Sequence, residues 1–413
     1  MKKINEKQLD RIRGALYGVA VGDALGGPLE FMSDWQICNT YGRVTDMIGG
    51  GWLNLKPGEV TDDTQMTLCV ARGILDALEG DNGLDLVASV GQQFIAWADS
   101  KPKDIGGACS HSIAVAKLRG RFRLQGVPTA TDWEEAARQT RRDGGRPVEG
   151  NGALMRTVYP GLYCSTKGGA EIQARAFAEM THRGDKSTEA CILYTRMVYL
   201  LTEAVNKYQD GNVADFLHEC LKGTFYDASV EKPATYAAGG YVVDSMCTAV
   251  SCLAHAQTFE EAVCAAANLG GDTDTNAAIT GGLAGAWFGF SAIPARWVDA
   301  LAPDHPIKGT VFEAIRGAMG DLHRIRDVRP VVEKMAQCEL VTGADVTAMR
   351  LGSGSCEARL ELPRSLFYET MSQQTGFPIR NDGELLSLLR ELAGVQAAYK
   401  KVAAAMEEVR ATG

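Results

Sequence analysis

Residues 13–30 of the chain have the sequence RGALYGVAVGDALGGPLE. Glycines recur in it at every fourth position: Gly14, Gly18, Gly22 and Gly26. A second set repeats the spacing far along the chain: Gly281, Gly285 and Gly289. Residues four apart share one face of a helix, so each set predicts a flat strip that a neighbouring backbone approaches closely. Each glycine costs about 1 kcal/mol of helix propensity relative to alanine, and close packing of central helices is the expected compensation. A phosphate-binding loop is the alternative interpretation.

The rest of the first 300 residues also predicts helices. Apolar residues form one stripe at intervals of four: Met66, Val70, Ile74 and Leu78. Comparable spacing recurs in five further stretches: 84–99, 170–181, 186–208, 238–256 and 259–268. Alternating apolar and polar residues, the pattern of strands, are scarce in this region. We therefore expect an all-α body.

Composition restricts the class of protein. The chain has 413 residues, of which 46% are hydrophobic, and a net charge of −9, which is typical of a globular protein and argues against a nucleic-acid-binding surface. Its eleven cysteines include no C-x-x-C pair, which favours reduced thiols in a cytoplasmic protein. The small, apolar run at 14–29 is interrupted by Asp23 and Pro28, and no apolar segment follows the charged start. We expect neither a membrane span nor a signal peptide.

The pattern changes after about residue 325. Residues 336–362 alternate more and predict a small β-hairpin or two. A long heptad helix is predicted at about 383–411, with both core positions apolar from Leu385 to Val409. We expect one domain at 1–302 and a small α+β extension of unknown role at 325–413. The heptad helix would mediate homo-oligomerisation or dock a partner; packing on its own body is the alternative.

Two clusters of carboxylates and hydroxyls precede predicted helices. The first is Thr61-Asp62-Asp63-Thr64, and the second is Gly270-Gly271-Asp272-Thr273-Asp274-Thr275. Asp and Thr are also good helix caps, but a cap needs only one such side chain. Adjacent carboxylates repel one another unless a cation or a proton relieves them, and oxygen ligands suit Mg²⁺ or Mn²⁺ rather than Zn²⁺. We expect Asp23, in contrast, to tie the first helix to a neighbouring loop.

Five ordered motifs resemble the ADP-ribosylglycohydrolase family over roughly residues 9–300. They are Arg13 to Glu30 with Gly22-Asp23-Ala24-Leu25-Gly26, then Thr61-Asp62-Asp63-Thr64, Gly150-Asn151-Gly152-Ala153-Leu154-Met155-Arg156, Thr181-His182, and Gly271-Asp272-Thr273-Asp274-Thr275. The resemblance implies an orthogonally packed, all-helical catalytic domain with two divalent cations, Mg²⁺ or Mn²⁺.

The same resemblance implies roles for individual residues. The metal ligands would be Thr61, Asp62, Asp63, Asp272, Asp274 and Thr275. Glu30 would ligate an ion or assist the attacking water, and Asp104 would face the guanidinium of a modified arginine. ADP-ribose would be held by Gly150, Asn151, Gly152 and His182. Some relatives carry a Ser-Tyr pair just before the Gly-Asn-Gly loop, where this chain has Pro147-Val148-Glu149, so adenine stacking from that position is not expected.

The implied activity is metal-dependent removal of ADP-ribose from modified protein, with arginine as the expected linkage. The expected partners are an ADP-ribosylated protein and the product ADP-ribose. Two alternatives stay open: a hydrolase of another ADP-ribosyl linkage, such as serine or a nucleobase, and a non-catalytic ADP-ribose-binding relative. Arg156 is expected to contact an anion or to form a structural salt bridge.

Overall fold

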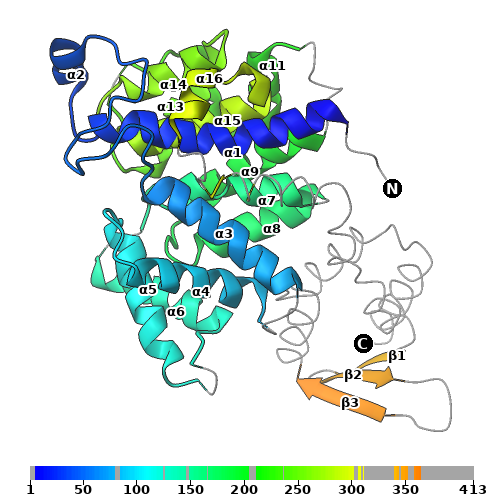
Figure 1. The fold of residues 1–413 in the computed structure, drawn as a ribbon. Coiled ribbons are helices and arrows are strands. Elements are labelled where there is room, and N and C mark those ends of the chain that lie inside the picture. Colours follow the sequence, from blue (N-terminus) through cyan, green and yellow to red (C-terminus); the bar gives the residue numbers. More distant parts are fainter. Residues whose placement is uncertain are drawn as a thin grey trace. The chain divides into compact units, whose positions relative to one another are not determined.

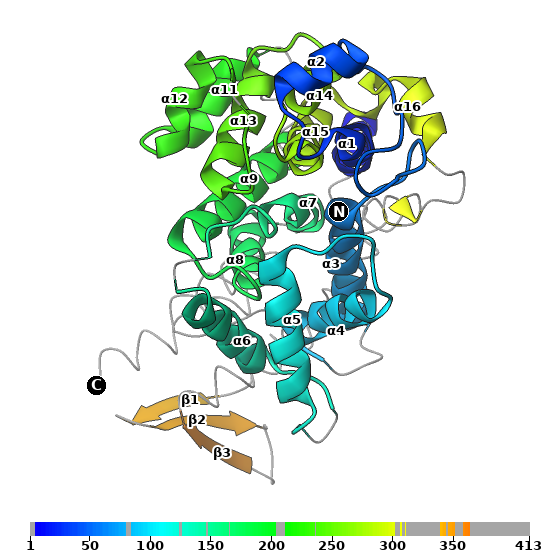
Figure 2. The same cartoon turned by 90° about the vertical axis from the view of Figure 1, so that its left-hand side faces the viewer.

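The structure is a computed structural model (Figures 1 and 2). It describes residues 5–79, 84–123, 126–145, 148–164, 166–203, 211–235, 237–301, 306–307 and 310, and the strands within 339–363. Residues 1–75 and 87–320 form one compact unit, and residues 76–86 and 321–413 form a second. All the predicted site residues belong to the first unit.

Before residue 302, the regular secondary structure of the described residues is helical apart from isolated β-bridges. The earlier ones are α1 (Glu6–Gly26), α2 (Asp34–Tyr41), α3 (Asp62–Glu79), α4 (Leu86–Asp99), α5 (Gly107–Gly120) and α6 (Ala130–Asp143). The later ones are α7 (Val158–Tyr163), α8 (Lys167–Ala178), α9 (Asp185–Glu203), α11 (Val213–Leu221), α12 (Ala228–Glu231), α13 (Val242–Ala254), α14 (Phe259–Ala267), α15 (Thr273–Phe288) and α16 (Ala295–Ala300). Short 3₁₀ turns are η1 (Gly27–Leu29), η2 (Leu154–Arg156), η3 (Phe225–Asp227) and η4 (Phe290–Ala292). The prediction of an all-α body is confirmed.

The two glycine sets face each other across α1 and α15, which lie side by side in Figures 1 and 2. A Cβ placed on Gly18 would lie 2.0 Å from the carbonyl oxygen of Gly281, and one on Gly285 would lie 1.9 Å from that of Gly14. The backbones are therefore in direct contact, as the spacing predicts. Gly289 also packs against α1, since a Cβ on Gly14 would lie 2.7 Å from its carbonyl carbon, and it ends α15 with φ +86°.

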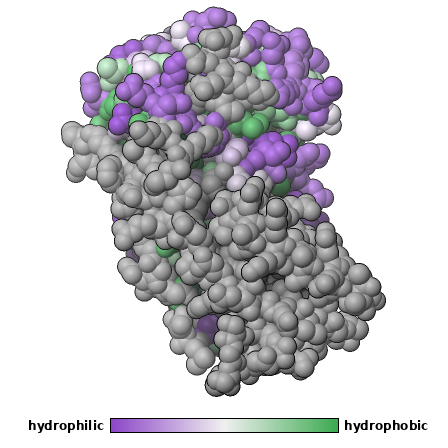
Figure 3. All heavy atoms as spheres, turned by 90° about the vertical axis from the view of Figure 1, so that its right-hand side faces the viewer, coloured by the Kyte–Doolittle hydropathy of each residue, from purple (hydrophilic) through white to green (hydrophobic). Residues whose placement is uncertain are grey.

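The packing of the first unit is orthogonal, as expected. In Figure 2, α1 is seen nearly end-on while α5 is seen from the side. The core is filled by large side chains that are almost fully buried, among them Trp133, Tyr159, Phe177, Tyr194 and Trp297. Among the described residues, no helix is long and apolar enough to cross a membrane. The described residues on the face shown in Figure 3 are mainly hydrophilic, with small hydrophobic patches.

Three strands are described in the second unit: β1 (Glu339–Gly343), β2 (Val346–Leu351) and β3 (Ala358–Pro363). They form an antiparallel sheet in the order β1-β2-β3, with Glu339 opposite Arg350 and Val346 opposite Pro363. The predicted hairpins within 336–362 are thus confirmed. The heptad helix predicted at about 383–411 lies outside the described residues.

Candidate active site

Asp23 of α1 fixes the start of α3. Its carboxylate accepts hydrogen bonds from the backbone N–H groups of Thr61 (2.9 Å) and Thr64 (3.0 Å). It also accepts the hydroxyls of Thr61 (2.8 Å) and Thr64 (2.5 Å). These four bonds confirm that Asp23 ties the first helix to a neighbouring segment. They place Asp62 and Asp63, the first residues of α3, against α1.

The start of α15 is held to the last residue of α1. The Thr273 hydroxyl donates to the carbonyl of Gly26 at 2.8 Å. Just before it, Gly270 and Gly271 adopt φ +79° and +82°, a conformation that only glycine takes without strain. The turn lets Gly271 exchange two backbone hydrogen bonds with Phe31 and Met32, each 2.8 Å long. Glu30 is thereby brought to the acidic start of α15.

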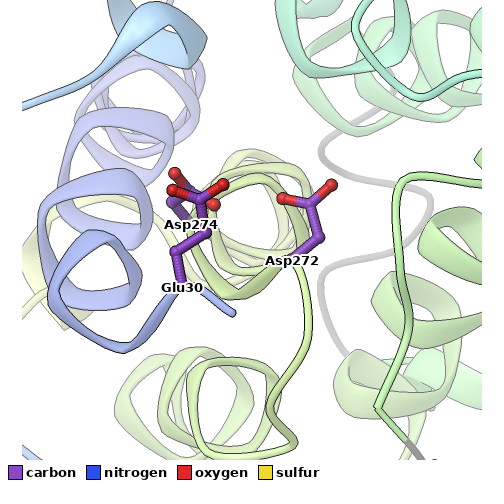
Figure 4. A group of neighbouring side chains, drawn as sticks. All are labelled: Glu30, Asp272 and Asp274. Carbon is purple, nitrogen blue, oxygen red and sulfur yellow. The ribbon is translucent and has the colours of Figure 1, made fainter. Parts of the chain in front are cut away.

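Three carboxylates meet at this point (Figure 4). One oxygen each of Glu30, Asp272 and Asp274 lies within 4.8 Å of the others. The two predicted acidic clusters also touch, because the Thr275 hydroxyl donates to Asp63 Oδ2 at 3.3 Å. The structure therefore brings together two sequence motifs that are 212 residues apart. Asp62 and Asp63 are not part of the group of three.

Burial raises the pKa of these acids. It is the main reason why the pKa of Glu30 is about 7 and that of Asp62 about 8. The charge of Asp272 raises the pKa of Glu30 further, while a hydrogen bond from Trp52 opposes the rise. Burial and neighbouring carboxylates also raise the pKa values of Asp63 and Asp274. In the absence of a cation, these groups therefore hold protons well above the ordinary range of carboxylic acids.

The donor set fits hard divalent cations. Asp63 Oδ1 is buried and has no hydrogen-bond partner among the described residues. The charges acting most strongly on Asp63 and Asp274 come from other carboxylates. A buried, unpartnered carboxylate oxygen is costly unless an ion or a proton occupies the space beside it. Carboxylate and hydroxyl oxygens are the ligands that Mg²⁺ and Mn²⁺ prefer.

The Gly150–Gly152 loop packs on His182. A Cβ on Gly150 would lie 3.0 Å from His182 Nε2, and one on Gly152 would lie 3.4 Å from the same atom. The two glycines thus make room for the imidazole ring, which is almost fully buried. Glu149, just before the loop, accepts the backbone N–H of Ser187 near the start of α9 at 2.7 Å. Glu149, which stands where some relatives have a tyrosine, therefore caps the start of α9.

Asn151 connects this loop to the acidic cluster. Its amide nitrogen donates to Asp272 Oδ2 at 2.8 Å and to the Ser245 hydroxyl at 3.0 Å. Its backbone N–H donates to Gly240. Asn151 therefore orients a carboxylate of the cluster, in addition to the contact with ADP-ribose implied by the resemblance.

Asp104 lies just before α5, half-buried, and accepts the backbone N–H of Ile105 at 2.8 Å. Its charge raises the pKa values of Glu30 and Asp62, which places it at the same acidic region. Arg156 is fully buried. Its guanidinium donates to the carbonyls of Gly152 (3.0 Å) and Phe177 (3.1 Å), and no carboxylate among the described residues forms the expected salt bridge with it. Contact with an anion stays a prediction.

Sequence reasoning missed Trp52 and Ser245. The indole N–H of Trp52 donates to Glu30 Oε2 at 2.5 Å, and its ring lies 5.4 Å from that of Phe31. Both rings are largely exposed beside the acidic cluster, at 53% for Trp52 and 69% for Phe31. A tryptophan directly after the turn sequence Gly49-Gly50-Gly51 is the signal in the sequence that points to it. No comparable signal marks Ser245.

The site is thus a group of carboxylates at the starts of two helices, beside a glycine loop and a buried histidine, on an all-helical body. The family model for ADP-ribosylglycohydrolase matches residues 4–330. The chain belongs to the ADP-ribosylglycohydrolase family.

Two relatives and a solved structure support this assignment. The chain is 34% identical to ADP-ribosyl-[dinitrogen reductase] glycohydrolase of Rhodospirillum rubrum, over 71% of this chain and 90% of that protein. It is 29% identical to ADP-ribosylarginine hydrolase Tri1 of Pseudomonas putida, over 72% and 76%. A solved structure titled ADP-ribosylglycohydrolase-related protein complex superposes with a TM-score of 0.59 and 28% identity, covering 76% of this chain and 98% of that one.

A second family model matches the other end of the chain. Residues 291–413 match the middle domain of stage IV sporulation protein A. The match to ADP-ribosylglycohydrolases ends at residue 330, so it does not account for residues 331–413. The two matches overlap at residues 291–330.

Proposed function

We propose that the protein hydrolyses the N-glycosidic bond between ADP-ribose and an arginine side chain of a modified protein, with two divalent cations, Mg²⁺ or Mn²⁺. The observation that carries this proposal is the meeting of Glu30, Asp272 and Asp274 with the start of α3, where Asp63 Oδ1 is buried and unpartnered. The ligands proposed for the ions are Thr61, Asp62, Asp63, Asp272, Asp274 and Thr275. When bound, the ions would supply Lewis acidity for the ribose hydroxyls and the attacking water.

The chain's own residues have distinct tasks in this proposal. Cleavage of an N-glycosidic bond passes through an oxocarbenium-like centre, which neighbouring carboxylates stabilise. Glu30 is held by the Trp52 indole and has a pKa of about 7 before a cation binds. We assign Glu30 the role of a general base, which orients the attacking water and accepts a proton from it. Asn151 keeps Asp272 in place through the 2.8 Å hydrogen bond.

Arginine is the proposed linkage because the leaving group is then a guanidine, which is cationic when protonated. Asp104 places a further negative charge at the acidic region without being part of the group of three. A carboxylate binds a guanidinium through strong, charge-assisted hydrogen bonds. The name of the relative from Pseudomonas putida, an ADP-ribosylarginine hydrolase, supports the same linkage.

The test is incubation of the protein with ADP-ribosyl-arginine and ADP-ribosyl-serine peptides, with Mg²⁺, with Mn²⁺ and after chelation. We expect release of ADP-ribose from the arginine peptide only when a cation is present. Release from the serine peptide alone would replace arginine as the substrate. Undiminished release after chelation would overturn the binuclear metal centre.

We also propose that residues 1–302 carry the catalysis and that 325–413 form a separate extension, whose heptad helix at about 383–411 mediates self-association or partner docking. Every proposed site residue precedes position 276, and the sporulation-protein match covers residues 291–413. Turnover of ADP-ribosyl-arginine by the full chain should equal that of a chain ended near Ala302. Loss of activity in a shortened chain that stays folded would contradict this division, and a change in mass by light scattering would support the assembly role.

A further inference from the structure

Arg156 holds a charge inside the protein without a carboxylate partner among the described residues. Its guanidinium lies 4.7 Å from the centre of the Phe94 ring. Besides the carbonyls of Gly152 and Phe177, it donates to Thr181 Oγ1 at 2.7 Å. Arginine is always protonated and has only donors. The Thr181 oxygen is therefore the acceptor in that bond.

Because Thr181 Oγ1 accepts from Arg156, the hydrogen of its own hydroxyl is directed to another acceptor. A hydroxyl has one hydrogen to donate. His182 Nδ1 lies 2.8 Å from Thr181 Oγ1. An imidazole nitrogen is a much better acceptor than a thiol sulfur such as that of Cys109 nearby. Donation from the Thr181 hydroxyl to Nδ1 satisfies both groups and puts the hydrogen of the neutral ring on Nε2.

The ring is also kept neutral. Burial, and to a smaller extent the charge of Arg156, lower the pKa of His182 to about 3. Two groups therefore act together: the Thr181 hydroxyl selects which nitrogen carries the hydrogen, and the guanidinium opposes a second proton. At neutral pH the imidazole is a donor through Nε2 only.

The Nε2 atom faces the loop that the resemblance assigns to ADP-ribose. It lies where side chains on Gly150 or Gly152 would collide with it, at 3.0 and 3.4 Å. Between these glycines, Asn151 contacts Asp272 of the acidic cluster. The N–H therefore faces a loop that contacts the acidic cluster through Asn151, while the contact that orients the ring is at Nδ1.

We propose that Arg156 is a positioning residue that acts through Thr181 to fix His182 as a neutral imidazole with its hydrogen on Nε2, so that the ring offers a hydrogen-bond donor to an oxygen of ADP-ribose. The last clause rests on the proposed function, whereas the fixed tautomer does not. Because it is uncharged, His182 contributes a directional donor and neither attracts phosphate as a cation nor transfers a proton.

The tautomer is tested by nitrogen NMR of the unliganded full chain labelled at histidine. The chain has six histidines, and the His182 signals are assigned by their absence from His182→Gln. We expect one protonated and one unprotonated nitrogen, with the hydrogen on Nε2 and no titration between about pH 5 and 8. A hydrogen on Nδ1, or a doubly protonated ring, would overturn the proposal whether or not the protein is a hydrolase.

The relay is tested with a matched pair of substitutions. Thr181→Val removes the hydroxyl, and the His182 ring signals of this variant should move towards values averaged over both tautomers. Thr181→Ser keeps a hydroxyl, so the His182 signals should stay as in the unsubstituted protein. Calorimetry with ADP-ribose should show roughly three- to tenfold weaker binding for Thr181→Val only, the effect of one neutral hydrogen bond. Thr202→Val is the control, since that buried hydroxyl bonds to the backbone of its own helix. Equal affinity of the two Thr181 variants would contradict the donor role.

Discussion

The two ends of α15 solve different physical problems. Its carboxyl-terminal half presents Gly281 and Gly285 to α1, and the two backbones touch without a side chain between them. Its amino-terminal end presents Asp272, Asp274 and Thr275 to Glu30 and to the start of α3. The close contact continues to the amino-terminal end, where a Cβ on Gly26 would lie 2.3 Å from the carbonyl oxygen of Thr273. The whole helix therefore depends on close packing, and its amino-terminal end adds the carboxylates. The close backbone contact fixes the carboxylates to positions that mutual repulsion would otherwise oppose.

The largest expected effect is that of a methyl group in the glycine contact. The Cβ of Gly18→Ala would lie 2.0 Å from a backbone oxygen of α15, and neither helix has a flexible side chain that can move away. We expect a loss of about 3 kcal/mol or more in the free energy of unfolding, with loss of activity because the acidic end is displaced. Chemical denaturation measures the stability.

Gly107→Ala is the matched control for this variant. Gly107 is also helical, but a Cβ there would meet no atom within 4 Å. Alanine should leave stability unchanged or raise it by up to about 1 kcal/mol. If both variants lost the same stability, the contact between α1 and α15 would not be the cause of the loss, because helix propensity alone favours alanine.

The second effect separates charge from shape. Asp62→Asn and Asp274→Asn each remove a proposed metal ligand but keep the size of the side chain. Turnover of ADP-ribosyl-arginine should fall on the order of 10³-fold or below detection, while the helical circular dichroism stays unchanged. Asp99→Asn, which changes an exposed partner of Lys117, should keep full activity. Undiminished turnover in either variant, after chelation and repletion with metal, would contradict the binuclear centre.

A smaller effect is expected at the edge of the acidic region. Asp104→Ala should lower turnover of an arginine-linked substrate roughly 10- to 100-fold, the contribution of one charge-assisted hydrogen bond. Binding of free ADP-ribose, which has no guanidinium, should change little. Calorimetry beside the turnover assay gives both quantities. Equal losses in the two would make Asp104 a scaffold residue or a ribose contact.

The smallest expected effect is on thermal stability. In the absence of metal, the folded protein holds protons on Glu30, with a pKa of about 7, and Asp62, with a pKa of about 8. The unfolded chain releases these protons above about pH 4. Unfolding thus releases protons between about pH 4 and 8, so the free energy of unfolding falls as the pH rises through this window.

In the proposed metal centre a divalent cation would bind the ionised carboxylates and cancel that loss of stability. The gain in melting temperature from Mg²⁺ or Mn²⁺ should therefore be larger near pH 8 than near pH 5, measured by calorimetry with chelator or cation. An equal gain at both pH values would indicate that the cation binds elsewhere.

The sequence predicts the glycine contact between α15 and α1 better than it predicts the arrangement of the carboxylates at the start of α15. The four-residue spacing of glycines was sufficient to predict that Gly14 and Gly285 lie in close backbone contacts, because helix periodicity is a local property. The acidic motifs were likewise found at the starts of two helices, because capping chemistry is local too. The structure adds which atoms approach one another.

The grouping of Glu30 with Asp272 and Asp274 could not be predicted from spacing. It depends on the turn at Gly270 and Gly271 and on a positive φ of +66° at Phe31, a backbone conformation that a bulky residue adopts only when tertiary contacts impose it. The hydrogen bonds from Trp52 to Glu30 and from Asn151 to Asp272 also depend on tertiary contacts. Each joins segments far apart in the chain.

The contact between α1 and α15 also determines when the protein can finish folding during synthesis. Gly26 and Thr273, which close its end next to the acidic cluster, are 247 residues apart. At about 5–20 residues per second, the ribosome takes roughly 12–50 s to make the intervening chain. During that time the glycine face of α1 lacks α15, and the acidic motif at Asp62 and Asp63 lacks the motif at Asp272 and Asp274. The acidic centre is thus completed only after the start of α15, with Asp272, Asp274 and Thr275, has emerged from the ribosome.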